Sequence, residues 1–357
     1  IAKLIIDLEV DQNFVQLSNE MQNLIKQKLT KMESNNEKAL TFINEESMDI
    51  YTCGTLNSTN FKSVLSCFPN VVFEINSDEK CFNDIFENLC ELSKELNMIK
   101  THINTSNPVE LTEIIKRRIL PISIAINSCI TSIEPNTFSE CKSLYQITIP
   151  ESVKSIGFRS FFKCSSLKQI EIPSNVELIE EGAFCQCYDI KKVDFKTNLL
   201  KRINKLVFSR CESLKKITLP SSVTIIETSA FESCSSLEEI KYPSTIEKID
   251  CYAFKGCEKL RKFVIPSTFK TIKMGIFYGC SSLTSIKIPS SVEIIESDAF
   301  NSCQSLKEII FEDQSSLKSI RNNAFSVCSS LETINIPESV KIIGPFCFFG
   351  CIKLNEI

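Results

Sequence analysis

Apolar and polar positions recur along most of the chain with a period near 23 residues. Each period has a leucine or isoleucine followed by two apolar residues two positions apart, as in Leu144, Ile147 and Ile149. Alternation of this kind predicts a short strand with one buried face. A second apolar pair, such as Val223 and Ile226, predicts another short strand, and the segment after it predicts a helical turn.

Each period also carries one phenylalanine and, three residues later, one cysteine. Successive cysteines are 23 residues apart, except for one interval of 24 and one of 25. The ladder cysteines are Cys141, Cys164, Cys187, Cys211, Cys234, Cys257, Cys280, Cys303, Cys328 and Cys351. The ladder phenylalanines are Phe138, Phe161, Phe184, Phe208, Phe231, Phe254, Phe277, Phe300, Phe325 and Phe348. Ten copies of one spacing indicate a repeated structural unit.

A single unit is too small to bury its own Leu, Ile, Val and Phe side chains, whereas stacked units share a continuous core. The pattern therefore predicts a solenoid over residues 120–357, with about ten coils and a parallel sheet on one face. The expected fold class is α/β. The two longer units predict surface loops at residues 196–199 and 312–315.

Residues 1–119 lack the repeat and differ in charge from the rest of the chain. They carry 12 Lys and Arg against 18 Asp and Glu, a net charge of −6, while residues 120–357 carry 28 against 26, a net charge of +2. Helical spacing of apolar residues at 17–29 and 82–99 predicts a mostly α-helical N-terminal domain or cap, with a strand-like run at 70–76.

Composition argues against an enzyme. His102 is the only histidine, which removes histidine triads and two-histidine zinc sites. Only 8 glycines are present, which disfavours glycine-rich phosphate loops, and no Cys-x-x-Cys pair suggests zinc. We expect no enzymatic activity, no metal and no cofactor. The net charge of −4 and the absence of an apolar run of 18 residues predict neither nucleic-acid binding nor membrane insertion.

The 18 cysteines allow three interpretations: a metal array, a disulfide chain or a buried structural column. Thiols that point the same way from stacked coils rarely reach disulfide geometry, and a buried free cysteine behaves as a small hydrophobic residue. The pattern favours the structural column. Cys185, Cys251 and Cys347 lie outside the ladder positions. So many unpaired thiols favour a reducing compartment.

The unit from Ile288 to Ile309, Ile-Pro-Ser-Ser-Val-x-x-Ile-x-x-x-Ala-Phe-x-x-Cys-x-x-Leu-x-x-Ile, resembles the BspA-like, or type 5, leucine-rich repeats. The resemblance implies a leucine-rich repeat solenoid that binds proteins. Members of the family occur on bacterial and protist surfaces, where they are associated with adhesion to host matrix proteins and to other cells. The Lys-, Asn-, Ile-, Ser- and Glu-rich composition without tryptophan resembles that of an AT-rich protist genome, where such repeats are abundant. The resemblance therefore suggests a protist surface-antigen type.

Outward positions of the first strand in each unit form a mixed polar surface without an aromatic cluster or a basic stripe. If a protein ligand binds there, the central charged positions are the best candidates; the alternative is a solvated sheet face. The candidates are Lys192, Asp194, Lys216, Glu239, Lys241 and Lys262.

Two functions remain open at this point. The first is cell-surface recognition or adhesion, with a host matrix or cell-surface protein as ligand; glycosylation acceptors at Asn57 and Asn104 would matter only in that case. The alternative is a cytoplasmic scaffold or adaptor with a partner-binding N-terminal domain. The stretch at 81–98 and the run before it faintly resemble the closing part of BTB-type domains.

Overall fold

The computed structural model describes residues 2–7, 40–43, 49–53, 71–76, 100–105, 122–126, 130–142 and 144–355. The chain divides into two compact units, each described by itself. Unit 1 comprises Ile1–Asn127 and Ser143–Thr148, and unit 2 comprises Ser128–Lys142 and Ile149–Ile357.

Unit 1 contains a seven-stranded sheet in the order β2-β3-β1-β4-β5-β6-β8. Its strands are β1 Ala2–Asp7, β2 Leu40–Ile43, β3 Asp49–Cys53, β4 Val71–Asn76, β5 Lys100–Thr105, β6 Ile122–Ile126 and β8 Leu144–Thr148. Neighbouring strands are parallel except β2 and β3, which are antiparallel. Strand β4 confirms the strand-like run at 70–76. The predicted helical segments at 17–29 and 82–99 lie outside the described residues.

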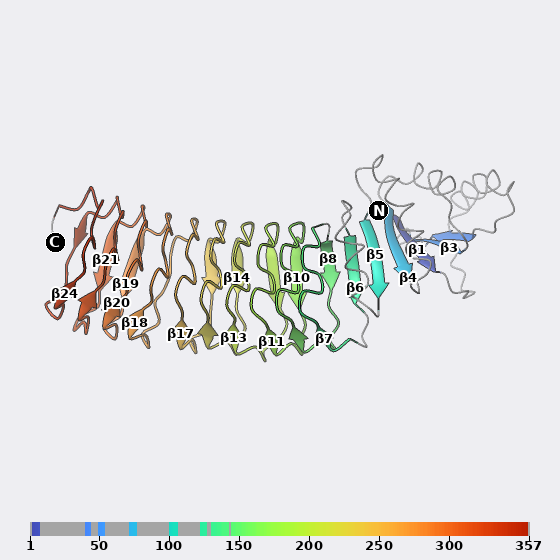
Figure 1. Cartoon of the computed structure of the whole chain (residues 1–357), viewed down its shortest axis with the longest axis horizontal. Helices are drawn as coiled ribbons and strands as arrows, with labels where there is room; N and C mark the ends of the chain where they lie inside the picture. Colours follow the sequence, from blue (N-terminus) through green and yellow to red (C-terminus); the bar gives the residue numbers. More distant parts are fainter. Residues whose placement is uncertain are drawn as a thin grey trace. The chain divides into compact units, whose positions relative to one another are not determined.

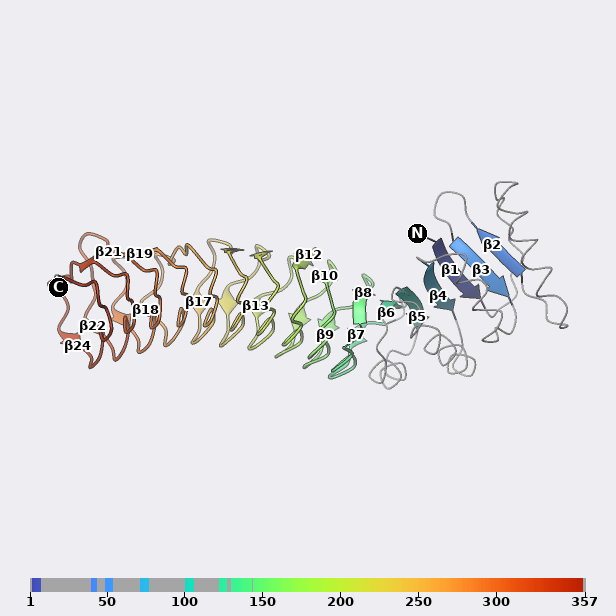
Figure 2. The same ribbon diagram turned by 90° about the horizontal axis from the view of Figure 1, so that it is seen from above.

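Unit 2 is a stack of coils that carries short parallel strands on two sides (Figures 1 and 2). The first-strand face consists of β10 Gln169–Ile172, β12 Lys192–Phe195, β14 Lys216–Thr218, β16 Glu239–Lys241, β19 Ser285–Ile288, β21 Glu308–Phe311 and β23 Thr333–Ile334. The second-strand face consists of β7 Ser132–Ile133, β9 Ser155–Ile156, β11 Leu178–Ile179, β13 Arg202–Ile203, β15 Ile225–Ile226, β17 Lys248–Ile249, β18 Thr271–Ile272, β20 Ile294–Ile295, β22 Ser319–Ile320 and β24 Ile342–Ile343. Equivalent isoleucines pair in register, as Ile286 does with Ile309.

The helical turn expected in each coil is wrong, because the described residues contain no helix. The segment around each ladder phenylalanine is a series of turns instead. The residues two before and two after the phenylalanine take positive φ, as Asn136 (59°) and Glu140 (63°) do around Phe138. The Phe138 N–H donates to the carbonyl of Ser160 in the next coil at 2.7 Å. In an α-helix that N–H would instead donate to the carbonyl four residues earlier in its own coil. The described repeats are therefore all-β, and the expected α/β class is wrong for them.

The ladder phenylalanines form a continuous column in the core. Neighbouring rings from Phe138 to Phe348 have centroids 5.1–5.9 Å apart and interplanar angles of 4–18°. The rings from Phe138 to Phe325 are fully buried. Near-parallel rings at this spacing add a stacking contribution to the burial of their area.

The ladder cysteines form a second column beside the rings. Each thiol from Cys164 to Cys351 donates to the carbonyl oxygen of the ladder phenylalanine in the preceding coil, at 3.1–3.4 Å. Burial raises the pKa of the ladder thiols from Cys164 to Cys303, that of Cys234 to about 12. The described cysteines from Cys164 to Cys351 form no disulfide. The expected structural column is therefore confirmed.

Phe254→Ala tests the core. The ring is buried at 0% exposure, and its truncation removes contacts with the rings of both neighbouring coils. We expect a loss of about 3–5 kcal/mol in the free energy of unfolding, measured by urea denaturation with circular dichroism. Phe349→Ala, at a residue with 64% exposure, is the matched control and should cost less than about 0.5 kcal/mol. Equal losses of unfolding free energy in the two variants would contradict a stabilising role for the ring column.

Val327→Gly tests the turns. Val327 is β-branched yet has φ of 58°, a backbone conformation that costs a non-glycine residue about 1–2 kcal/mol. Glycine relieves that strain and loses part of the gain to chain entropy, so we expect about 1 kcal/mol of stabilisation in urea unfolding.

The reciprocal variant is Gly279→Val, at the equivalent position two coils earlier, with φ of 71°. A Cβ added there would lie 3.8 Å from the nearest atoms, an ordinary contact, so its cost would come from the backbone. It should destabilise the protein by about 1–2 kcal/mol. Stabilisation by Gly279→Val, or a loss with Val327→Gly, would show that φ does not limit these turns.

Candidate functional site

The candidate binding residues lie on consecutive coils of the first-strand face. In β12, Val193 is buried while Lys192 and Asp194 lie on the outer side. The same alternation places Lys216 in β14 and Glu239 in β16 outward. The period-2 pattern thus orients these side chains because the intervening residues pack into the core.

Ion pairs connect most of these candidates. Glu239 binds two lysines through its two oxygens: Lys216 Nζ lies 3.1 Å from one and Lys241 Nζ lies 3.6 Å from the other. The hydrogen bond from Lys216, with the charges of both lysines, lowers the pKa of Glu239. Lys192 Nζ lies 3.5 Å from Asp194. Exposed pairs of this kind contribute little to stability, so they remain available to exchange for a ligand's charges.

The two longer units add charged residues that the sequence pattern did not assign to this face. Lys196 Nζ lies 3.0 Å from Asp194 and 3.5 Å from Glu171. This hydrogen bond from Lys196 is the main reason that the pKa of Asp194 is lowered. Glu312 lies 2.8 Å from Lys287 Nζ in the other long unit. The sequence indicated these residues only through the longer cysteine intervals of 24 and 25 residues. The spacing does not show which face a loop's side chains reach.

Lys262 differs from the other candidates. It lies in residues 261–266, which form no strand. The flanking strands β16 and β19 therefore pair only on their far sides, with β14 and β21. Among the described residues, Lys262 has no ion pair or hydrogen-bond partner. The structure therefore places five of the six candidates in ion pairs and leaves Lys262 apart.

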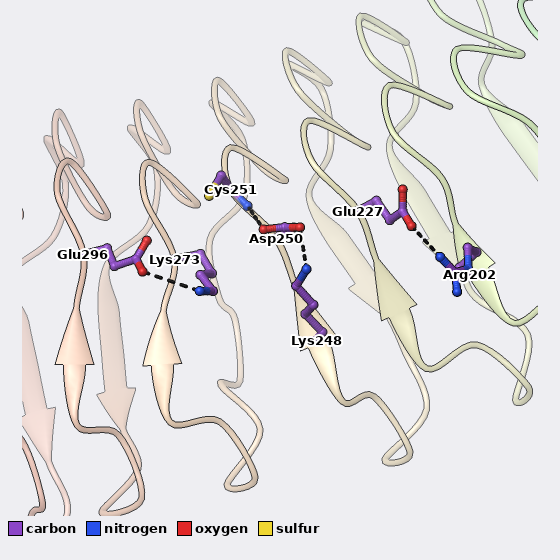
Figure 3. Close-up of polar contacts among 7 residues, drawn as sticks. All are labelled: Arg202, Glu227, Lys248, Asp250, Cys251, Lys273 and Glu296. Carbon is purple, nitrogen blue, oxygen red and sulfur yellow. Dashed lines mark hydrogen bonds and ion pairs between the residues drawn. The ribbon is translucent and has the colours of Figure 1, made fainter.

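The second-strand face carries its own charged residues, which are engaged with one another and with the backbone (Figure 3). They are Arg202, Glu227, Lys248, Asp250, Lys273 and Glu296, and the backbone of Cys251 takes part with them. Asp250 follows β17, lies 2.7 Å from Lys248 Nζ and accepts the Cys251 N–H at 2.9 Å. Burial acts to raise the pKa of Asp250, but these hydrogen bonds outweigh it and hold that pKa below its ordinary value. The carboxylates here stabilise turns at the ends of strands.

The repeat geometry agrees with a family comparison. A model described as BspA type leucine rich repeat region, with 6 copies, matches residues 121–238 and 224–355. The chain belongs to the BspA-type leucine-rich repeat family. This confirms the resemblance at the level of the family. Comparison with curated proteins gave no match.

Several solved structures are similar to this BspA-type chain, and the first one below shares its fold. A leucine-rich repeat protein from Bacteroides ovatus is 22% identical, with a TM-score of 0.52, covering 90% of this chain and 93% of its own. A leucine rich cell surface protein from Faecalibacterium prausnitzii is 24% identical, with a TM-score of 0.44, covering 80% and 72%. The pneumococcal vaccine antigen PcpA is 20% identical, with a TM-score of 0.31, covering 64% and 75%.

Among the described residues, no group of three or more His, Cys, Asp or Glu side chains is placed to hold a metal ion. The same part of the chain contains no helix with the length and apolar character needed to cross a bilayer. The described first-strand face thus offers paired charges on short parallel strands, with Lys262 apart from them.

Asp250→Asn tests the electrostatics of the second-strand face. A lowered folded pKa means that the ionised carboxylate stabilises the fold above the unfolded pKa, about 3.9, and that this contribution is lost as pH falls through the folded value. We expect a cost of about 1 kcal/mol at pH 7 that shrinks by pH 3, measured by urea unfolding. Asp313→Asn, at an exposed residue, is the control. A cost independent of pH would contradict this assignment.

Proposed function

We propose that this BspA-type protein is a non-enzymatic protein-binding solenoid that recognises its ligand through the first-strand face. The supporting observation is a row of exposed charges of both signs, held at fixed spacing by the strands of consecutive coils. Repeat proteins use such extended surfaces to bind other proteins. A surface of mixed sign suits a protein with complementary charges, whereas a nucleic acid would require a basic stripe.

The proposed setting is the cell surface, with recognition or adhesion as the role and a host matrix or cell-surface protein as the ligand. The family relationship supports this setting. A protist surface antigen is the finer form of the same proposal, and it rests on composition.

A specific observation favours a second candidate, a cytoplasmic scaffold. The described cysteines from Cys164 to Cys351 form no disulfide, and Cys251 and Cys351 among them are partly exposed. Exposed unpaired thiols are more typical of a reducing compartment than of a cell surface. In that case the N-terminal region would bind one partner and the solenoid another.

Protease shaving of intact source cells, combined with thiol-state labelling, separates the two candidates. For a surface protein we expect cleavage of the chain on intact cells, with the buried ladder thiols unreactive until the protein is unfolded. A cytosolic protein digested only after lysis is the control. Protection of the chain in intact cells, with all thiols reduced, would overturn the surface role and favour the scaffold.

A further inference from the structure

The first-strand sheet is interrupted twice between β10 and β23: β12 does not pair with β14, and the coil at residues 261–266 forms no strand at all. The backbone of this coil joins neither β16 nor β19, so the sheet is interrupted there. Neither the Lys262 N–H nor the Val264 N–H has an acceptor among the described residues. Every other first-strand segment between β10 and β23 is a strand paired with a neighbour.

Two aromatic residues distinguish the core of this coil. Phe263 occupies a core position that is isoleucine in the adjacent coils, and Tyr242 directly follows the preceding first strand, β16. Their rings lie 5.3 Å apart, and Phe263 also packs 5.1 Å from Phe254 and 4.8 Å from Phe277. The Tyr242 hydroxyl donates to the carbonyl of Val264. The Phe263 ring is larger than the isoleucine of the adjacent coils and fills the core at this coil.

The surface over this coil combines an apolar side chain with an unpaired positive charge. Val264 is 76% exposed, the highest value for a large apolar residue in the described chain outside the last coil. It occupies the repeat position of Lys241 in the coil before and of Lys287 in the coil after. Lys262 lies two residues away and has no carboxylate partner among the described residues.

Charges in the neighbouring coils are positive in excess. Four lysines, at 216, 241, 262 and 287, lie on the first-strand face of four consecutive coils. Two carboxylates oppose three of them: Glu239 is shared by Lys216 and Lys241, and Glu312 pairs with Lys287. A ligand that supplies a carboxylate to Lys262 therefore completes the pairing without displacing an existing partner.

We infer that residues 262–264 are the anchor of the binding face and take a protein segment in which an acidic side chain adjoins an apolar one. The acidic group pairs with Lys262, and the apolar group covers Val264. A sulfated polysaccharide would use the lysines and leave Val264 exposed, so the apolar residue at the centre favours a protein segment. This inference rests on the proposed function, because it specifies the partner of the same face.

Fluorescence polarisation tests the anchor with a fluorescein-labelled Glu-Leu-Glu-Leu-Glu peptide and the whole chain. We expect Val264→Ser to raise the dissociation constant about tenfold and Lys262→Gln about fivefold. Ile352→Ser, at an exposed residue of the last coil, and Lys259→Gln, at an exposed residue of the turn after Cys257, are matched controls that should leave it unchanged. A Glu-Ser-Glu-Ser-Glu peptide of equal charge should bind more weakly.

Equal binding of both peptides, or no effect of Val264→Ser, would overturn the anchor and indicate general attraction of polyanions. Absence of binding by the Glu-Leu peptide would overturn it as well. A further experiment separates failure of the anchor from failure of the proposed function. Two variants of the chain, with a photo-crosslinking residue at position 264 or at position 192, are incubated with source cells and irradiated. Capture of a protein at 192 but not at 264 overturns only the anchor, whereas capture at neither position overturns the role of the whole face.

Discussion

The carbonyl oxygen of each ladder phenylalanine holds two coils together. It accepts the N–H of the cysteine three residues later in its own coil, as Phe231 does from Cys234 at 3.2 Å. It also accepts the thiol of the cysteine in the next coil, as from Cys257 at 3.3 Å. A carbonyl oxygen has two lone pairs, so both bonds form without competition. Because the group is buried beside a stacked ring, leaving it unpaired would be costly, and each coil depends on the next for its completion.

That junction determines the shape of the turns around it. The N–H groups at alternate residues must point to the next coil, and the chain achieves this with positive φ two residues before and two after each phenylalanine. Glycine occupies only some of these positions, and Leu206 and Val327 adopt the same conformation. The packing of ring on ring and thiol on carbonyl thus compensates for a local backbone strain that most sequences avoid.

Recurrence in the sequence was enough to predict the solenoid, its two short strands per coil and its buried columns, because each depends on residue types at fixed spacing. The turns were misjudged as helical because their conformation depends on hydrogen bonds between coils, and residues as different as Asn136 and Val327 occupy them. On the candidate face, spacing predicted which side chains point outward. It did not reveal that Lys196 and Glu312 reach the face from inserted loops, since ion pairs depend on the path of those loops.

The same regularity makes an exception in one coil informative. The core position of the other first strands is isoleucine or valine, whereas Phe263 occupies more space and packs against rings of both adjacent coils. The core stays filled while the sheet loses its ladder at that point. Its surface then exposes Val264, where adjacent coils have Lys241 and Lys287. The core positions of this repeat vary little from coil to coil. The one coil with phenylalanine at the first-strand core position is thus also the one that exposes an apolar side chain where its neighbours expose lysine.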